Sequence, residues 1–113
     1  MSARVAATHV WPSDLDQPLS VDLLDLDWGG PVGDRHHGET MSSDTRQSSV
    51  FPRGTTIRNH RQLSLVDIAE LAQIADALGI PRIDPGTIAE NITTEGIEEL
   101  TALPRMTRPA WPP

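Results

Sequence analysis

The sequence predicts a mainly β protein with a few helices (α+β), because strand-like segments and frequent turns surround a single amphipathic helix pattern. Ten prolines and eight glycines in 113 residues favour many turns over long helices. A chain of this length forms one domain with a modest core. Tyrosine is absent and phenylalanine occurs once, so the core has to come mainly from Leu, Ile, Val and three Trp. We therefore expect one small domain of marginal stability.

Four segments have the features of short strands. Residues 1–12 carry a first strand. Residues 21–28 alternate apolar and acidic side chains, which is typical of a half-buried strand, before Gly29-Gly30-Pro31 breaks the pattern. Residues 61–66 are expected to form the next strand, and the β-branched residues 92–94 the last.

The helix is expected from Asp67 to Leu78. Asp67 and Glu70 have the spacing of a capping box, in which each side chain accepts from an otherwise unpaired backbone amide. Gly79 is placed to end the helix, and Pro81 prevents it from resuming. The apolar positions are spaced to form one stripe that packs on a sheet; they are Ile68, Leu71, Ala72, Ala75 and Leu78.

The middle and the end of the chain are turn-rich. Residues 39–56 are polar, and within them residues 39–49 are predicted to be a flexible surface loop that forms a lid or rim. The domain is expected to span residues 1–108, and residues 109–113 form a proline-rich tail.

Composition excludes several classes of function. Sixteen acidic and nine basic residues give a net charge of −7, which disfavours binding to nucleic acid. No segment has the roughly 20 apolar residues of a membrane span or the pattern of a signal peptide, so we expect a cytoplasmic protein without membrane contact. Cysteine is absent, which rules out disulfides and thiolate nucleophiles in these residues.

The first candidate site is the segment Gly33-Asp34-Arg35-His36-His37-Gly38. Flanking glycines let the backbone approach a ligand, and Arg35 with a protonated histidine forms a donor set for an anion such as a phosphate or a pterin. Two alternatives remain: a structural turn in which Asp34 caps local amides, and a metal site. The metal site is disfavoured because adjacent histidines point apart.

The second candidate is a basic segment in an otherwise acidic chain. Arg53, Arg58, His60 and Arg61 lie within nine positions. A local positive patch indicates a small anionic ligand rather than a polyanion. The alternative is that these arginines pair with nearby aspartates at the surface, each pair contributing ~0–1 kcal/mol.

The third candidate runs from Gly86 to Ile97. Asn91 is able to adopt left-handed dihedrals or to donate its amide to the edge of a ring. Glu90 and Glu95 are candidate acids or bases. Residues 13–27 contain five aspartates, whose carboxylate oxygens are ligands that Mg²⁺ and Ca²⁺ prefer, but their spacing matches no EF-hand loop. The alternative is that they form a solvated face.

These motifs resemble those of the MOSC family, the C-terminal domain of molybdenum cofactor sulfurases. Three blocks occur in the family's order: Val21–Gly38, Val50–Leu78 and Asp84–Arg108. They contain Gly-Asp-x-His-x-Gly at 33–38, Phe-Pro-Arg-Gly-Thr at 51–55, Arg-Gln-x-Ser-Leu at 61–65 and Glu-Asn-x-Thr-Thr-Glu-Gly-Ile at 90–97.

The resemblance implies a β-barrel-like fold and a link to the molybdenum cofactor (molybdopterin), through sulfur transfer or through reduction of N-hydroxylated substrates. Pyridoxal phosphate is associated with the family's sulfurases through a separate domain. The partner implied is an anionic small molecule or pterin cofactor. Carried over by position, the residues expected to contact it are Arg35, His36, His37, Arg53, Arg58, Arg61 and Asn91.

The chain departs from the family after Arg108. In the family, further strands and a Pro-Cys segment follow, and that cysteine bears the sulfur or ligates the molybdenum; here residues 109–113 read Pro-Ala-Trp-Pro-Pro. We therefore expect a domain truncated at its C-terminus, an incomplete barrel, and no catalytic or metal-ligating residue of its own. An incomplete barrel leaves strand edges open, so the alternative function is an interaction module that forms a homodimer through a sheet edge. A metal-dependent hydrolase using His36, His37 and the aspartates is a third reading.

Overall fold

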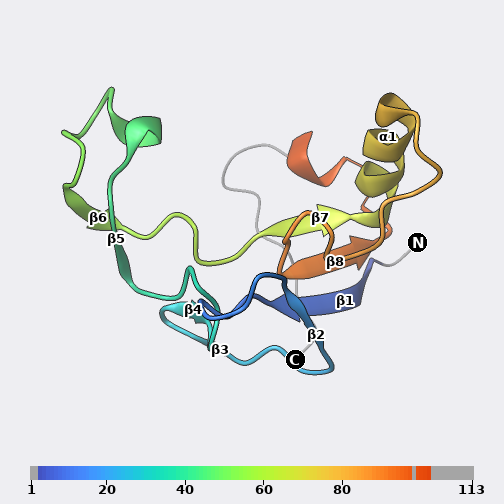
Figure 1. Ribbon diagram of the computed structural model, residues 1–113, viewed down its shortest axis with the longest axis horizontal. Coiled ribbons are helices and arrows are strands. Elements are labelled where there is room, and N and C mark those ends of the chain that lie inside the picture. Colours follow the sequence, from blue (N-terminus) through green and yellow to red (C-terminus); the bar gives the residue numbers. More distant parts are fainter. Residues whose placement is uncertain (1–2, 98, 103–113) are drawn as a thin grey trace.

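The computed structural model describes residues 3–97 and 99–102, which form one four-stranded sheet, two two-stranded sheets and one α-helix (Figure 1). The proline-rich tail and residues 103–108 lie outside the described part of the chain. The helix and the main sheet form one side of the molecule in Figure 1, and a long hairpin extends away from them on the other.

The main sheet has the order β2-β1-β8-β7. Its central pair is β1 (Arg4–Val10) and β8 (Ile92–Glu95), which run antiparallel with an irregularity between Val5 and Ala7. Strand β2 (Leu19–Val21) pairs antiparallel with β1, whereas β7 (Leu65–Asp67) pairs parallel with β8. The first and last predicted strands are therefore neighbours at the centre of the sheet.

Helix α1 (Ile68–Leu78) connects the parallel strands β7 and β8 and starts directly after β7. The predicted capping box is confirmed: Asp67 accepts from Ala69 N at 3.0 Å, and Glu70 accepts from Asp67 N at 3.1 Å. Gly79 ends the helix in the left-handed conformation, with φ of 70°.

The face that α1 buries is narrower than the predicted apolar stripe. Leu71 and Ala75 are buried as expected, but Ile68 and Leu78 remain exposed. The third buried helix residue is Glu70, which the apolar pattern did not include. One oxygen of its carboxylate accepts from Asp67 N, and the other accepts from Thr101 in the 3-10 turn η2 (Leu100–Ala102). Burial therefore leaves neither oxygen without a hydrogen-bond partner.

The prediction of one strand over residues 21–28 is wrong. The chain leaves β2 at Val21 and forms a separate small hairpin, β3 (Leu26–Asp27) with β4 (Gly30–Pro31). The turn is fixed locally because the Asp27 carboxylate accepts from Gly29 N at 2.8 Å. The alternating pattern was misleading because three of its five apolar side chains are exposed: Leu23, Leu26 and Trp28, the last by 89%.

Residues 39–56 contain more regular structure than the predicted surface loop. Strand β5 (Thr40–Ser42) pairs antiparallel with β6 (Thr56–Arg58), and the 3-10 turn η1 (Thr45–Gln47) lies between them. We call residues 40–58 the β5–β6 arm. The mobility predicted for residues 39–49 stays a prediction. The strand predicted over residues 61–66 is shorter than expected, since only Leu65 and Val66 belong to β7.

The predicted fold class, mainly β with an amphipathic helix over about residues 67–78, is confirmed. Over the described residues the strands form three open sheets, and none closes into a barrel. No helix in this part of the chain is long and apolar enough to cross a bilayer. The cytoplasmic location stays a prediction.

Candidate anion-binding site

Residues 33–38, which we call the His turn, are held in place by Asp34. Its buried carboxylate accepts from Trp11 N at 2.7 Å and from His36 N at 3.1 Å. Arg35 N donates to Trp11 O at 2.7 Å, which fixes the turn to the end of β1. Asp34 therefore caps local amides, as the structural-turn interpretation expects, and its oxygens do not face a ligand.

Asn91 is the residue that joins the sheet to the His turn. Its amide nitrogen donates to His9 O and to Asp34 Oδ1, both at 3.1 Å, and its amide oxygen accepts from Ser64 N at 3.1 Å. The side chain is buried, and all of these partners belong to the protein. The Asn91 side chain therefore links the sheet to the His turn, and its predicted contact with a ligand stays a prediction. Among the non-glycine residues of this segment, the one with positive φ is Ala89, at 66°, rather than Asn91.

Two of the predicted ligand contacts are partly engaged by the protein. The Arg35 guanidinium lies 3.7 Å from the centroid of the Trp11 ring and donates to Pro12 O and Leu15 O. His37 Nε2 lies 2.6 Å from Asp27 Oδ1. This hydrogen bond, with a second from Gly29 N, lowers the pKa of the Asp27 carboxyl. The two histidines do point to different partners, since His36 Nδ1 lies 3.6 Å from Asp34.

Asn59 and Gln62 bring the basic segment against the His turn. Asn59 Nδ2 donates to His36 O and Gly38 O, both at 2.7 Å, and Gln62 Nε2 donates to Gly38 O at 2.9 Å. Both amide residues lie between or beside the arginines, and sequence reasoning missed them. The signal that could have found them is that amide side chains often satisfy glycine-turn carbonyls. As a result, two motifs more than twenty residues apart share one surface.

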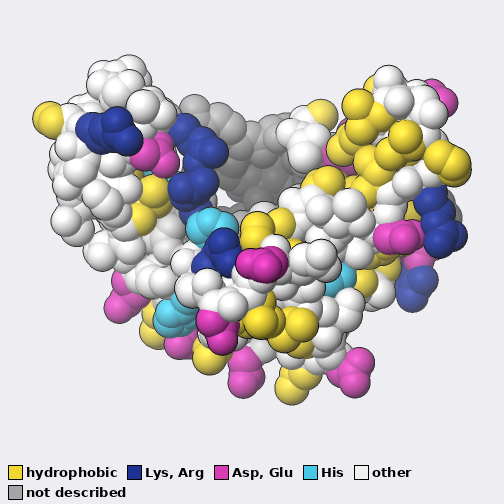
Figure 2. Space-filling view, viewed as in Figure 1, with side chains coloured by type: hydrophobic (Ala, Val, Ile, Leu, Met, Phe, Trp, Pro, Cys, Tyr) yellow, Lys and Arg dark blue, Asp and Glu magenta, His cyan; other side chains and the backbone are white. Residues whose placement is uncertain are grey.

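Arginine side chains gather on the β5–β6 arm and at its base. Arg53 and Arg58 are exposed, and Arg61 lies 3.4 Å from Asp44, which is also 3.7 Å from Arg46. The expectation of surface pairing with aspartates therefore holds for Arg61. From residue 39 to residue 62 the sequence has four arginines and only two acidic residues, in a chain of net charge −7. Figure 2 shows these basic side chains on the inner and outer sides of the arm.

The arrangement is suited to holding a small anion. Guanidinium groups bind phosphate and carboxylate oxygens through paired donors, and the half-exposed His36 ring adds a further donor when protonated. Within the residues that the structure describes, no three His, Asp or Glu side chains are grouped as a metal site requires. The donors in this part of the chain therefore suit an anion better than a metal ion.

A family model, described as the MOSC domain, matches residues 33–108. The chain belongs to the MOSC domain family. The resemblance predicted from the sequence motifs is confirmed, and the match includes the His turn, the β5–β6 arm, α1 and β8.

This MOSC domain is similar to YuaD from Bacillus subtilis (strain 168), whose name describes metal-sulfur cluster biosynthesis. The two are 36% identical over 112 residues, which is 99% of this chain and 58% of YuaD. The crystal structure of YuaD superposes with a TM-score of 0.83, covering 92% of this chain and 57% of that one. The chain thus spans somewhat more than half the length of the relative it matches, and the two share a fold.

Proposed function

We propose that this MOSC domain binds a small anionic ligand on the surface shared by the His turn and the β5–β6 arm. The observation that carries the proposal is the pair of 2.7 Å hydrogen bonds from Asn59 to the His turn. They hold the chain segment around Asn59, which includes Arg58 and Arg61, against the His turn. Exposed arginines concentrated in one region of an acidic protein steer a small anion to it.

The residues present fit the phosphate end of a molybdopterin cofactor. Arg53, Arg58 and Arg61 would hold the phosphate, and Asn59 would keep the two parts of the site in register. When bound, such a cofactor supplies molybdenum-centred oxygen or sulfur transfer. These 113 residues contain no cysteine, so the sulfur or metal ligand of that chemistry is not among them. Asn91 has a positioning role in this proposal, and Arg35 contributes mainly by shaping the turn against Trp11.

The name of YuaD supports a role in the same area of metabolism. We propose that the domain takes part in handling a metal-sulfur or molybdenum cofactor as a binding module, and that it carries no catalytic residue itself. Pyridoxal phosphate, which the family's sulfurases use, offers the same phosphate chemistry and is a useful competitor in a binding experiment.

Titration calorimetry with inorganic phosphate, and under anaerobic conditions with molybdenum cofactor, tests this proposal. We expect saturable binding that the double variant Arg58→Gln/Arg61→Gln weakens by about tenfold or more, because charge-assisted donors to the anion are lost. Raising the salt concentration should weaken binding as well. Competition by pyridoxal phosphate with phosphate, but not with the molybdenum cofactor, would indicate separate sites.

The matched control is Arg4→Gln/Arg82→Gln, which removes the same charge from two exposed ion pairs outside the site. This variant should keep affinity within about twofold of the parent protein. Equal losses in the two double variants, or no saturable binding of either ligand, would show that the surface is not a ligand site.

A second function, self-association through a sheet edge, is favoured by the exposed apolar side chains. Only five hydrophobic residues are buried among those described, whereas the exposed large ones include Leu19 on the edge strand β2. On the opposite edge strand, β7, Val66 and Asp67 are buried and Leu65 is half-buried. We propose that two copies pair through β2, which would give its unpaired backbone groups partners.

Sedimentation velocity over a range of concentrations tests the pairing. We expect a monomer–dimer equilibrium that Leu19→Lys shifts to monomer, because a charged side chain on an edge strand disfavours pairing with a second strand. Leu78→Lys, at an apolar position on α1 that is also exposed, is the control and should leave the equilibrium unchanged. A folded monomer at all concentrations would rule out this function.

A further inference from the structure

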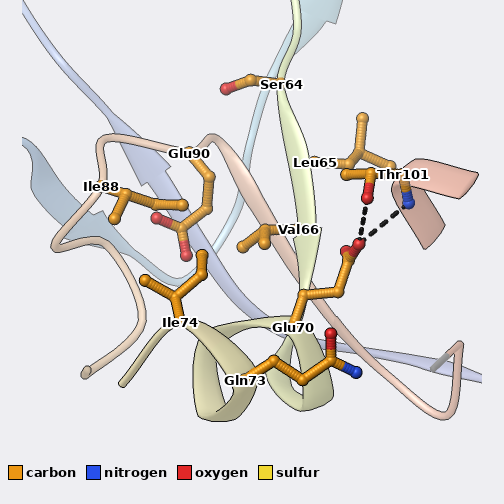
Figure 3. Close-up of a pocket in the computed structure, with 9 residues that line it drawn as sticks. All are labelled: Ser64, Leu65, Val66, Glu70, Gln73, Ile74, Ile88, Glu90 and Thr101. Carbon is orange, nitrogen blue, oxygen red and sulfur yellow. Dashed lines mark hydrogen bonds between the residues drawn. The ribbon is translucent and has the colours of Figure 1, made fainter. Parts of the chain in front are cut away.

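A pocket of about 330 Å³ lies between β7, α1, η2 and the loop that leads into β8. Figure 3 shows its lining, in which Val66 from β7, Ile74 from α1 and Ile88 from the loop form apolar walls. This volume and lining are typical of small-molecule sites, which are mostly apolar with a few placed polar groups. The pocket is distinct from the surface formed by the His turn and the arm, and its residues come from other elements.

Glu90 is the polar group that makes this pocket unusual. Its side chain is only 3% exposed, and Oε2 accepts from Gly86 N at 3.0 Å and from Thr93 Oγ1 at 2.6 Å. Its other oxygen, Oε1, is buried without a hydrogen-bond partner. Buried carboxylate oxygens are almost always paired, and leaving one unpaired is unfavourable. In Figure 3 the Glu90 carboxylate lies between Ile88, Ile74 and Val66, against the space of the pocket.

A second carboxylate, Glu70, lines the same pocket and is fully used by the protein. It accepts from Asp67 N and, through Oε2, from the backbone and hydroxyl of Thr101. The remaining polar lining residues are neutral, and no Arg or His lines the pocket. Two acidic groups in a mostly apolar pocket, whose lining includes no Arg or His, favour a ligand that carries positive charge.

We propose that this pocket binds a small organic cation, a primary amine with an apolar body. The ammonium group would donate to the unpaired oxygen of Glu90, and the apolar body would contact Val66, Ile74 and Ile88. The proposal is independent of the anion site, because the ligand has the opposite charge and no residue of the His turn or the β5–β6 arm lines the pocket.

Benzylamine and its neutral counterpart benzyl alcohol are suitable probes, followed by ¹H–¹⁵N NMR of the whole chain. We expect saturable shifts of the amides of Ile74, Ile88 and Thr101, and at least about tenfold tighter binding of benzylamine than of benzyl alcohol. Glu90→Gln keeps the shape and removes the charge, so it should weaken benzylamine about tenfold and leave benzyl alcohol unchanged.

Two further variants keep the test decisive. Asp76→Asn removes one negative charge from α1 at an exposed position outside the pocket and should change affinity less than twofold. Ile74→Trp fills the pocket, retains both carboxylates and should abolish the shifts even if Glu90→Gln fails to fold. The proposal is overturned if benzyl alcohol binds as tightly as benzylamine. It is equally overturned if Asp76→Asn weakens benzylamine as much as Glu90→Gln, if Ile74→Trp still binds, or if no probe saturates.

Discussion

Asn91 connects three segments that are far apart in the sequence. Its amide bonds the end of β1 at His9, the entry to β7 at Ser64 and the His turn at Asp34. Because an amide has both donors and an acceptor, no other small side chain satisfies all three partners. The family motif that contains Asn91 is therefore explained by structure before any ligand is considered.

Substitution of Asn91 should destabilise the protein and weaken anion binding only indirectly. Asn91→Ala removes one of three donors to the buried Asp34, and it also removes the side-chain partner of His9 O and of Ser64 N. It should therefore cost roughly 1–3 kcal/mol of unfolding free energy. Asn91→Asp should cost more, because it places a second carboxylate beside Asp34. Urea unfolding measures both, with Thr87→Ala, an exposed change in the same loop, as control. Unchanged stability together with lost phosphate binding would instead make Asn91 a direct contact.

Glu70 should make the fold sensitive to acid. Burial on its own would raise the pKa of the Glu70 carboxyl, but hydrogen bonds from Thr101 and from Asp67 N outweigh burial and lower that pKa below its ordinary value of 4.5. The unfolded chain therefore binds the proton more readily than the folded one. The stabilisation is complete above pH 4.5 and is lost as the pH falls through the lower pKa of the folded state.

The variant Thr101→Val tests this coupling, because it removes the hydroxyl donor to Glu70 and keeps the shape. At pH 7 it should lower the unfolding free energy by about 1 kcal/mol, and the difference from the parent protein should shrink as the pH falls below 4.5. Urea unfolding at several pH values measures this. Thr87→Val is the control for the substitution itself, and a difference that does not depend on pH would contradict the coupling.

At the level of elements, two capping boxes of the same kind have different surroundings. Asp67 caps α1, and its second oxygen also accepts from Thr94 Oγ1 at 2.6 Å and from Ile97 N at 2.8 Å. Asp44 caps the short turn η1 on the arm, where its side chain is partly exposed and pairs with arginines. The first cap joins a helix to β8, and the second closes only a local turn.

Asp67→Ala should therefore destabilise the protein by roughly 2–4 kcal/mol, the sum of a lost cap and two buried donors left unpaired. Asp44→Ala should cost at most about 1 kcal/mol, since water can replace the hydrogen bonds and ion pairs of this partly exposed side chain. Thermal and urea unfolding of the two variants make the comparison. Similar losses at the two positions would mean that the bonds to Thr94 and Ile97 contribute little.

This contrast also shows which elements the sequence could predict. Helix α1 was predicted with its cap and its end because those signals lie within a few residues of one another. The prediction of one strand over residues 21–28 failed because Gly29-Gly30 and the Asp27 turn fold the chain back, and Leu23, Leu26 and Trp28 are exposed. The pairing of β5 with β6 was missed because each residue pairs with one that is fourteen to eighteen positions away, and residues 40–42 and 56–58 have little apolar pattern.

The same limit applies to the candidate site. Arg53, Arg58 and Arg61 were predicted from local charge, and their exposure agrees with that charge pattern. Asn59 and Gln62 were missed because their importance depends on the His turn that they contact. Glu90 was predicted only as a candidate acid or base, since nothing in its neighbours shows that one of its oxygens would be buried without a partner.

The whole molecule has two parts of unequal packing. The sheet and α1 hold most of the buried residues, whereas the β5–β6 arm extends away from them in Figure 1 and buries only Ser43 and Ile57. The radius of gyration, 15.3 Å, exceeds the roughly 13 Å expected for a compact chain of this length. The arm therefore depends on its own hairpin and on the bonds made by Asn59 at its base.

Such an arm should open without unfolding of the sheet. Native-state hydrogen exchange should show low protection for the amides of β5 and β6 and high protection for those of β1 and β8, because local opening needs less buried area to be exposed. Asn59→Ala should lower protection in the arm about tenfold further and leave β1 and β8 unchanged, since it removes two bonds at the arm's base. Inorganic phosphate, if bound by the arginines, should raise protection in the arm of the parent protein. Equal protection in the arm and the sheet, lost together in Asn59→Ala, would mean that the two parts unfold as one unit.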